Sequence, residues 1–472
     1  MATNSELEAE VQKQWRLRAE YRNRPVHNRL LHNEFTESTA QKLQTDRLLQ
    51  VLMEHCYDTV PYYQDKFLEC GIRRRHLRDA GVLSNLPILE RREIIAAQDL
   101  LHARQPMRGQ SFGGYTRTSG STGEPVTVRH SNLSLGFFPW LKQRELRWFR
   151  WQPHGSLLSI RPAAELSPED QGKSIPKGVV QQLQTWPLLG DKFETGPSWG
   201  FSHANPVTAQ ADLLGSLHPN YLLMQAAGIE HLSLQVIDAA ALDQLHGALA
   251  ISQTLTPAMR KLAENALQVP VQQNYGLNEI GLVASRCPEA GRYHVHSEHC
   301  LVEIVDDDGR QCAPGETGRL LVTGLNNSLM PLLRYDADDL AEVAGGPCPC
   351  GRKLPSFADI IGRYRRIAYL PEGTFPRWGA IQRFLVEYSL ANPGSIRQYQ
   401  VIQDREANFL LRIDCAPEVL SLLKPELQNA FEEAAEGSDC PALRVEASRD
   451  FVGVDQRKFQ SFISAFTPES DQ

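Results

Sequence analysis

The amino-acid sequence predicts an α/β fold with α+β elements. One observation is the alternation, over residues 206–270, of helical stretches with short apolar runs such as Leu232–Ile237. Another is a hairpin signal, Asp306–Gly309, which separates two β-like runs. The third is a pair of strand patterns within residues 397–414, followed by helical periodicity over 417–436.

The N-terminal part of the chain is predicted to be helical. Residues 5–55 lack strand patterning and are rich in Leu, Glu, Gln and Arg, which favour helices. Pro61 biases Val60 away from the helical conformation, so we expect the helical stretch to end there. Another helix is expected over 131–151, a segment rich in aromatic side chains. These rings are compatible with core packing and with part of a ligand-binding pocket.

Composition restricts the class of protein. The chain has 472 residues, of which 22% are charged and 42% hydrophobic, as expected for a globular protein with more than one domain. A net charge of −7 argues against a nucleic-acid partner. The opening residues do not resemble a signal peptide, and no apolar run reaches the roughly 18 residues of a membrane span. Nine widely spread cysteines argue against a disulfide framework. We therefore expect a cytoplasmic protein with neither a membrane nor a nucleic-acid partner.

The most informative stretch is rich in glycine and hydroxyl side chains and closes at Pro125. It comprises Thr118, Ser119, Gly120, Ser121, Thr122, Gly123 and Glu124. Glycines let a backbone approach a ligand closely, and successive amides with hydroxyls can bind phosphate oxygens. The stretch lacks the lysine of a Walker loop. A flexible linker is the alternative, but the β-favouring run Val126–Val128 follows directly, which favours an anion-binding loop.

A second candidate site follows a short β-like run. The run ends at Asn274, Tyr275 and Gly276, and Glu279 comes three residues after the glycine. Ligands of open α/β sheets bind beyond the carboxyl ends of strands, so an aromatic ring and a carboxylate are well placed there. A structural turn is the alternative for this spacing.

A third candidate site is a set of cysteines and histidines. Cys348 and Cys350 form a tight Cys-x-Cys, and Cys287 lies 61 residues before Cys348. Between them lie His294, His296, His299 and Cys300. A structural zinc takes four Cys or His ligands in a closed tetrahedral shell. Three thiolates and one of these histidines would complete it, and free cysteines beside a surface histidine are the alternative.

Together these motifs resemble the adenylate-forming (ANL) superfamily. The stretch 118–125 resembles its phosphate-binding loop, and the segments 60–67 and 83–94 before it are similar to the layout of the phenylacetate-CoA ligase branch. The resemblance implies an acid–thiol ligase that converts a carboxylic acid and ATP to acyl-AMP and pyrophosphate. An aromatic acid and transfer of the acyl group to CoA are implied by the branch.

The resemblance assigns roles to individual residues. Thr118–Gly123 would hold the phosphates, with Ser119 and Thr122 as donors. Tyr275, between Asn274 and Gly276, would stack on adenine, and Glu279 would hold Mg²⁺, which prefers carboxylate and phosphate oxygens.

Later motifs complete the assignment. Asp339 matches the ribose-binding aspartate and Arg363 an arginine that contacts ribose or phosphate. Lys458 resembles the catalytic lysine, which would neutralise the charge that builds up on the reactants. The resemblance also selects the zinc ligands as Cys287, His294, Cys348 and Cys350, because several proteins of the branch combine Cys-x6-His with Cys-Pro-Cys-Gly.

Some positions depart from the family pattern. Asn278 stands where Thr or Ser is usual, and Asp338 replaces a glycine, so we expect a different local turn there. Arg365 replaces the hinge aspartate beside Arg366, and the glycine expected before Lys458 is missing. Two alternatives therefore stay open: transfer of the acyl group to a carrier protein or an amine, and a non-catalytic nucleotide-binding homologue.

The resemblance also implies a domain division. Residues 1–361 would form the large domain with its helical N-terminus, 362–366 the hinge, and 367–472 the small, mobile domain. Members of the branch are often homodimers, and the sequence leaves that state open.

Overall fold

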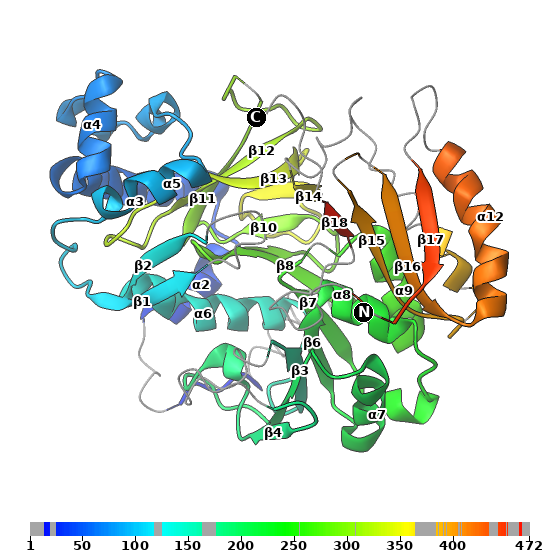
Figure 1. Cartoon of the computed structure of the whole chain (residues 1–472). Coiled ribbons are helices and arrows are strands. Elements are labelled where there is room, and N and C mark those ends of the chain that lie inside the picture. The colour runs from blue at the N-terminus through cyan, green and yellow to red at the C-terminus, as the bar shows by residue number, and fades with distance from the viewer. Residues whose placement is uncertain are drawn as a thin grey trace. The chain divides into compact units, whose positions relative to one another are not determined.

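A computed structural model of the chain describes residues 14–18, 25–117, 125–162, 176–253, 255–306, 308–363, 384–385, 387–389, 391–392, 394–404, 406, 408–433, 442–449, 451 and 462–464. The chain divides into two compact units, whose helices and strands are labelled in Figure 1. The first comprises residues 1–152, 187–194 and 274–363, and the second residues 153–186, 195–273 and 364–472. Each unit is described by itself.

The first unit opens with helices and a hairpin. The helices are α2 (Pro25–Asn33), α3 (Ser38–Thr59), α4 (Pro61–Glu69) and α5 (Arg91–Ala97). Strands β1 (Phe112–Arg117) and β2 (Thr127–Ser131) pair antiparallel, and α6 (Asn132–Trp148) follows at once. Helix α3 ends because Val60 takes an extended conformation before Pro61, the first residue of α4.

An antiparallel sheet forms the rest of the first unit. Its strands, in spatial order, are β11 (Cys300–Val305), β12 (Thr317–Gly324), β13 (Tyr335–Val343), β14 (Ser356–Arg363), β10 (Tyr293–Val295), β9 (Gly281–Arg286) and β8 (Val271–Leu277). Leu52 of α3 and Phe67 of α4 share one buried cluster with Val322 of β12 and Tyr335 of β13. The helical layer therefore packs on the sheet that carries the predicted nucleotide motifs.

The second unit contains a mostly parallel sheet. Its strands, in spatial order after the first residues of β8, are β7 (Gly247–Ile251), β6 (Tyr221–Gln225), β3 (Leu157–Arg161), β5 (Ser198–Ser202) and β4 (Val180–Leu183), of which β4 is antiparallel. Helices α7 (Val207–Leu217), α8 (Ala226–Ser233) and α9 (Pro257–Leu267) bury Leu214, Ile229 and Met259 in one cluster with strand residues. β6 and β7 are buried along their whole length, as expected of parallel strands inside an α/β layer.

The C-terminal residues of the second unit form a smaller sheet. Strands β17 (Leu443–Ala447), β16 (Phe409–Cys415), β15 (Ile396–Gln403) and β18 (Phe462–Ser464) lie in that order, with α12 (Pro417–Glu433) beside them. Tyr399 of β15 donates a 2.5 Å hydrogen bond to Glu230 of α8, and both side chains are buried. This sheet therefore packs on α8 within the second unit.

The predicted α/β fold class is confirmed. The two patterns within 397–414 are the antiparallel pair β15–β16, and the runs around Asp306–Gly309 are the antiparallel pair β11–β12. The apolar run Leu232–Ile237 is not a strand, because its first residues end helix α8. A boundary between the two units falls between Arg363 and Tyr364, inside the proposed hinge 362–366, but residues 153–186 and 195–273 group with the C-terminal residues. The three-part domain division stays a prediction.

Among the described helices, none is both long and apolar enough to cross a membrane.

Candidate functional site

Part of the predicted nucleotide site lies outside the described residues. These positions are Thr118, Ser119, Gly120, Ser121, Thr122, Gly123, Lys458 and the side chain of Arg363. The strands on either side of the loop are described: β1 ends at Arg117, and β2 begins at Thr127. Their antiparallel pairing fixes both ends of the loop sequence side by side.

Glu279 lies in the turn that joins β8 to β9. Its carboxylate oxygen Oε1 accepts a 2.8 Å hydrogen bond from the hydroxyl of Tyr335 and lies 3.4 Å from Nη1 of Arg91. Burial raises the pKa of Tyr335, and the Glu279 carboxylate raises it further, so the hydroxyl stays protonated and donates. Glu279 itself is 7% exposed. A buried carboxylate is thus held beside a cation that is itself partly exposed.

Tyr275 and Asp339 are in direct contact. The Tyr275 hydroxyl donates a 2.8 Å hydrogen bond to Oδ2 of Asp339. Asp339 in turn is the cross-strand partner of Arg363 in the β13–β14 pairing. The structure therefore brings together an aromatic ring, a carboxylate and an arginine backbone that are far apart in the sequence.

Asn274 and Gly276, on either side of Tyr275, serve the hairpin locally. Nδ2 of Asn274 donates a 3.2 Å hydrogen bond to the fully buried Glu145 of α6. A Cβ atom at Gly276 would lie 3.1 Å from the carbonyl oxygen of Gly281, so a side chain there would crowd the hairpin. Asn274 therefore ties β8 to α6, and the glycine permits close approach of β8 to β9.

The predicted zinc ligands form a compact cluster. The ligand atoms of Cys287, His294, Cys348 and Cys350 all lie within 4.8 Å of one another. Zinc–sulfur bonds of about 2.3 Å in a tetrahedral shell place two sulfurs about 3.8 Å apart. Sγ of Cys348 lies 3.8 Å from Sγ of Cys287, and Sγ of Cys350 lies 3.3 Å from Nε2 of His294. The residues present therefore fit a tetrahedral zinc ion.

The structure also distinguishes between the candidate histidines. His294 directs Nε2 toward the sulfurs, while its Nδ1 lies 3.4 Å from the carbonyl oxygen of Leu354, an arrangement that orients a metal-binding imidazole. His296 instead contacts Ser285, and His299 contacts the carbonyl of Ile280. A hydrogen bond from Cys287 and the nearby His294 lower the pKa of the Cys350 thiol, which favours the thiolate that binds metal.

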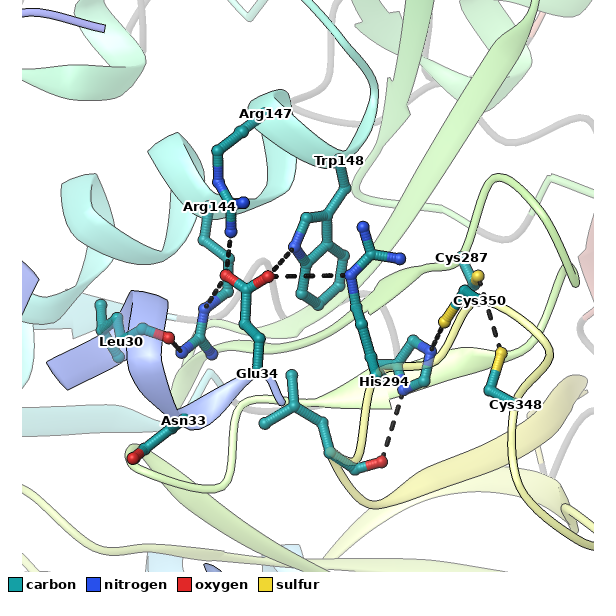
Figure 2. A network of polar contacts seen from close by, with 12 residues as sticks. Leu30, Asn33, Glu34, Arg144, Arg147, Trp148, Cys287, His294, Cys348 and Cys350 are labelled. Carbon is teal, nitrogen blue, oxygen red and sulfur yellow. Dashed lines mark hydrogen bonds and ion pairs between the residues drawn. The ribbon is translucent and has the colours of Figure 1, made fainter. Parts of the chain in front are cut away.

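Beside this cluster lies a network of buried charges around Glu34, which follows α2 (Figure 2). Its carboxylate accepts hydrogen bonds from Arg147 and, at 2.9 Å, from Nε1 of Trp148. Arg144 lies 3.4 Å and Arg352 3.7 Å from the same carboxylate. The Arg352 guanidinium also stacks on the Trp148 ring at 4.5 Å.

Arg352 connects the network to the metal cluster, because it follows Cys350 by two residues. Its Nη1 lies 3.5 Å from Glu289, whose carboxylate oxygen Oε2 lies 3.2 Å from Sγ of Cys287. The backbone N–H of Lys353 donates a 2.8 Å hydrogen bond to the carbonyl of Glu34. The cysteine-rich segment thus contacts the residue that follows α2 through both side chain and backbone.

Comparison with known proteins finds similar enzymes by sequence. No family model matches the chain. It is 26% identical over 323 residues to the phenylacetate-coenzyme A ligase of Escherichia coli, covering 66% of this chain and 69% of the relative. It is 24% identical over 374 residues to the enzyme of the same name from Thermus thermophilus, covering 78% and 79%. These similarities support the resemblance of the chain to the phenylacetate-CoA ligase branch of the adenylate-forming superfamily.

Solved structures share the fold of this chain. A 2-hydroxyisobutyryl-CoA ligase in complex with R3-HIB-AMP matches with a TM-score of 0.69 at 14% identity, over 92% of this chain and 91% of the other. An anthranilate-CoA ligase in complex with anthranoyl-AMP matches with a TM-score of 0.53 at 12% identity, over 79% and 76%.

Asp338, where the family pattern has a glycine, adopts a backbone conformation that glycine favours. Asp338 has a φ of 60°, in the left-handed region that glycine adopts most readily, and its N–H donates a 2.9 Å hydrogen bond to Oδ1 of Asp336. Aspartate tolerates this conformation better than most residues. The expectation of a different local turn at this position stays a prediction, and the backbone shows that Asp338 adopts a φ that a glycine would also permit.

No sequence motif predicted a role for Arg91 or Tyr335, although both contact Glu279. Tyr335 stands within the same motif as Asp339, and that adjacency was its only signal. Arg91 lies 188 residues before Glu279, in a segment noted only for its resemblance to the branch. Contacts over such separations become visible only in three dimensions.

Proposed function

We propose that this protein activates a carboxylic acid with ATP, forming acyl-AMP and pyrophosphate, and then transfers the acyl group to CoA. The observation that carries the proposal is the joining of two separate motifs. Tyr275 and Glu279, in and beside β8, bind Asp339 and Tyr335 of β13 through two hydrogen bonds of 2.8 Å each. Residues with adenine, magnesium and ribose roles in the superfamily thus lie together, as one nucleotide would require.

Glu279 would hold Mg²⁺ together with phosphate oxygens, a ligand set that this ion prefers. Bound there, the ion would neutralise phosphate charge during transfer of the adenylyl group to the acid. The carboxylate suits this role because Tyr335 already donates to one of its oxygens, which fixes its orientation. Arg91, 23% exposed at its side chain, is the cation that accompanies Glu279 in this structure.

The remaining roles follow from the family pattern. Asp339 would accept hydrogen bonds from ribose hydroxyls, and Tyr275 would stack on adenine. Thr118–Gly123, with Ser119 and Thr122 as donors, would bind the departing pyrophosphate. Lys458 would neutralise the acid and the α-phosphate, and Arg363 would contact ribose or phosphate.

These residues would act by positioning and electrostatics, not by covalent catalysis. A carboxylate oxygen of the acid bonds to the α-phosphorus as the bond to pyrophosphate breaks. The thiol sulfur of CoA, having lost its proton, then bonds to the acyl carbon, and AMP leaves with the electron pair. An aromatic acid is the substrate class proposed from the branch.

The metal cluster is proposed as a structural zinc site. Cys287, His294, Cys348 and Cys350 would fill all four positions of a tetrahedral shell, so no position would remain for substrate. The ion would crosslink the turn after β9 to the segment between β13 and β14. We further propose a cytoplasmic enzyme that can act as a homodimer.

The acceptor carries one alternative. Arg365 and Arg366 replace the family's hinge sequence. This departure favours the alternative in which a carrier protein or an amine takes the acyl group in a biosynthetic pathway. Pyrophosphate exchange without a CoA-dependent product would support this second acceptor class.

The test is ATP–pyrophosphate exchange against a panel of aryl, amino and fatty acids, with Mg²⁺ and without an acceptor. We expect exchange with at least one aryl acid, and a loss of about 100-fold or more in Glu279→Gln, because that variant removes the carboxylate charge. Addition of CoA should then give the thioester.

The control variant is Glu37→Gln, an exposed residue before α3, which should retain wild-type exchange. If the folded wild-type protein binds ATP but exchanges no pyrophosphate across the panel, the catalytic proposal is wrong and the non-catalytic nucleotide-binding alternative replaces it.

A further inference from the structure

Each residue of the turn that carries Glu279 is held by a side chain from a different part of the chain. The carbonyl of Asn278 accepts a 2.6 Å hydrogen bond from the hydroxyl of Thr116 in β1. The carboxylate of Glu279 is bound by Tyr335 of β13. The carbonyl of Ile280 lies 2.9 Å from Nε2 of His299, just before β11. Two backbone anchors therefore flank the carboxylate on both sides.

The Thr116 anchor is itself supported by His130. Nε2 of His130 lies 2.7 Å from the Thr116 hydroxyl oxygen, because the two residues are diagonal neighbours on one face of the β1–β2 hairpin. The single hydroxyl hydrogen of Thr116 points to the acceptor-only carbonyl of Asn278. The imidazole must therefore donate from Nε2, which leaves Nδ1 as the acceptor for the Ser134 hydroxyl at 3.3 Å.

Burial keeps this relay in one protonation state. His130 is 2% exposed, and burial lowers its pKa to about 4, so it is neutral near pH 7. The same effect lowers the pKa of His299, whose Nε2–H donates to Ile280. The carbonyls on both sides of Glu279 thus accept from neutral donors of fixed orientation.

The relay also spans two predicted motifs. Thr116 is the second residue before Thr118, the first position of the proposed phosphate loop. Asn278 is the residue before Glu279, the proposed magnesium ligand, and it stands where the family usually has a hydroxyl side chain. In this chain a hydroxyl from β1 reaches the backbone at that position instead.

We propose that Thr116, supported by His130 and Ser134, is a positioning residue that fixes the turn carrying the Glu279 carboxylate against strand β1. This inference rests on the proposed binding of Mg²⁺ and ATP at Glu279. Thr116 touches neither substrate nor metal and acts through the backbone of Asn278. Its removal would take one of two donors from the Asn278 carbonyl, which the His130 imidazole also reaches, and the turn would shift.

The experiment measures how strongly Mg²⁺ raises the affinity for ATP, by calorimetry on the full chain, together with pyrophosphate exchange where an acid is known. Thr116→Val should raise the half-saturating Mg²⁺ concentration about tenfold and lower kcat of exchange, with KM for the acid unchanged. Thr116→Ser, which restores the hydroxyl, should recover most of the loss. Thr208→Val, exposed on α7, is the control for the same chemical change elsewhere.

The outcomes separate this inference from the function on which it rests. If Glu279→Gln loses the Mg²⁺ effect but Thr116→Val keeps it, the positioning role is wrong and the proposed function stands. If Glu279→Gln also keeps the effect, the magnesium assignment fails and this inference fails with it. Thr116→Ala supplies the same comparison if valine disturbs the hairpin.

Discussion

The turn that carries Glu279 and the charged network around Glu34 are held together in opposite ways. The turn relies on neutral hydrogen-bond donors, namely Thr116, Tyr335 and His299, with Arg91 as a partly exposed cation. The network consists of charges that water does not reach: Glu34 and Arg352 both have fully buried side chains. The first arrangement orients a carboxylate beside a cation that is partly exposed. The second arrangement leaves no room for exchange.

The difference has an energetic consequence. A buried charge is costly unless it is paired, so removing one member of a buried ion pair is more damaging than the pair's own net contribution. In the network, Arg144 binds Glu298 bidentately at 3.1 and 2.7 Å. Burial would raise the pKa of Glu298, but Arg144 holds that pKa below its ordinary value. Damage near the metal cluster should therefore appear as lost stability, and damage near the turn as lost activity.

The largest effect on stability is expected from Cys350→Ser. The change removes one proposed zinc ligand and loosens the segment that presents Arg352 to Glu34. We expect loss of about one equivalent of zinc and destabilisation of several kcal/mol, because metal-binding free energy contributes directly to folding. Metal analysis and thermal unfolding, with and without a chelator, measure both quantities.

Cys70→Ser is the matched control, since Cys70 is an exposed free cysteine. It should retain both zinc and stability. Wild-type protein that carries no zinc after expression in zinc-supplemented medium would contradict the structural-zinc assignment.

The next largest effect is expected from Glu34→Gln. The amide keeps an acceptor for the indole N–H of Trp148 but removes the charge that faces Arg144, Arg147 and Arg352. We expect a loss of about 3 kcal/mol in the free energy of unfolding, measured by denaturant titration, with zinc still bound. Glu37→Gln, exposed in the same region, should change stability little. Equal stability of the two variants would show that the charge of Glu34 contributes nothing to the free energy of unfolding.

The features that the sequence could predict depend on patterns that are local in the chain. The fold class, the β15–β16 pair and the β11–β12 pair followed from patterns that are local in the chain. The zinc ligands could be proposed because cysteines are few and their spacing restricts the choices. His294 was separated from His296 and His299 by a family pattern, and the structure places its Nε2 beside Cys350.

What could not be predicted depends on long-range burial. Nothing local marks Glu34 as fully buried, because its partners Arg144 and Arg352 come from remote segments. Thr116 likewise has no distinguishing pattern, and its role follows only from its contact with Asn278. A short apolar run such as Leu232–Ile237 fits a strand and a helix end equally well. In the structure its first residues end helix α8.

The smallest effect concerns strain on the nucleotide side of the comparison. Asp338 adopts a left-handed φ of 60°, next to Asp339, whereas glycine would adopt it without a Cβ penalty. Asp338→Ala should lower the free energy of unfolding by about 1 kcal/mol, since alanine tolerates this conformation less well than aspartate. Asp338→Gly should stay within about 0.5 kcal/mol of wild type, because relief of strain offsets the greater freedom of the unfolded chain. Denaturant unfolding of the three proteins decides between strain and a side-chain role. If both variants lose the same stability, the contribution comes from the aspartate side chain, and the backbone at this position is not strained.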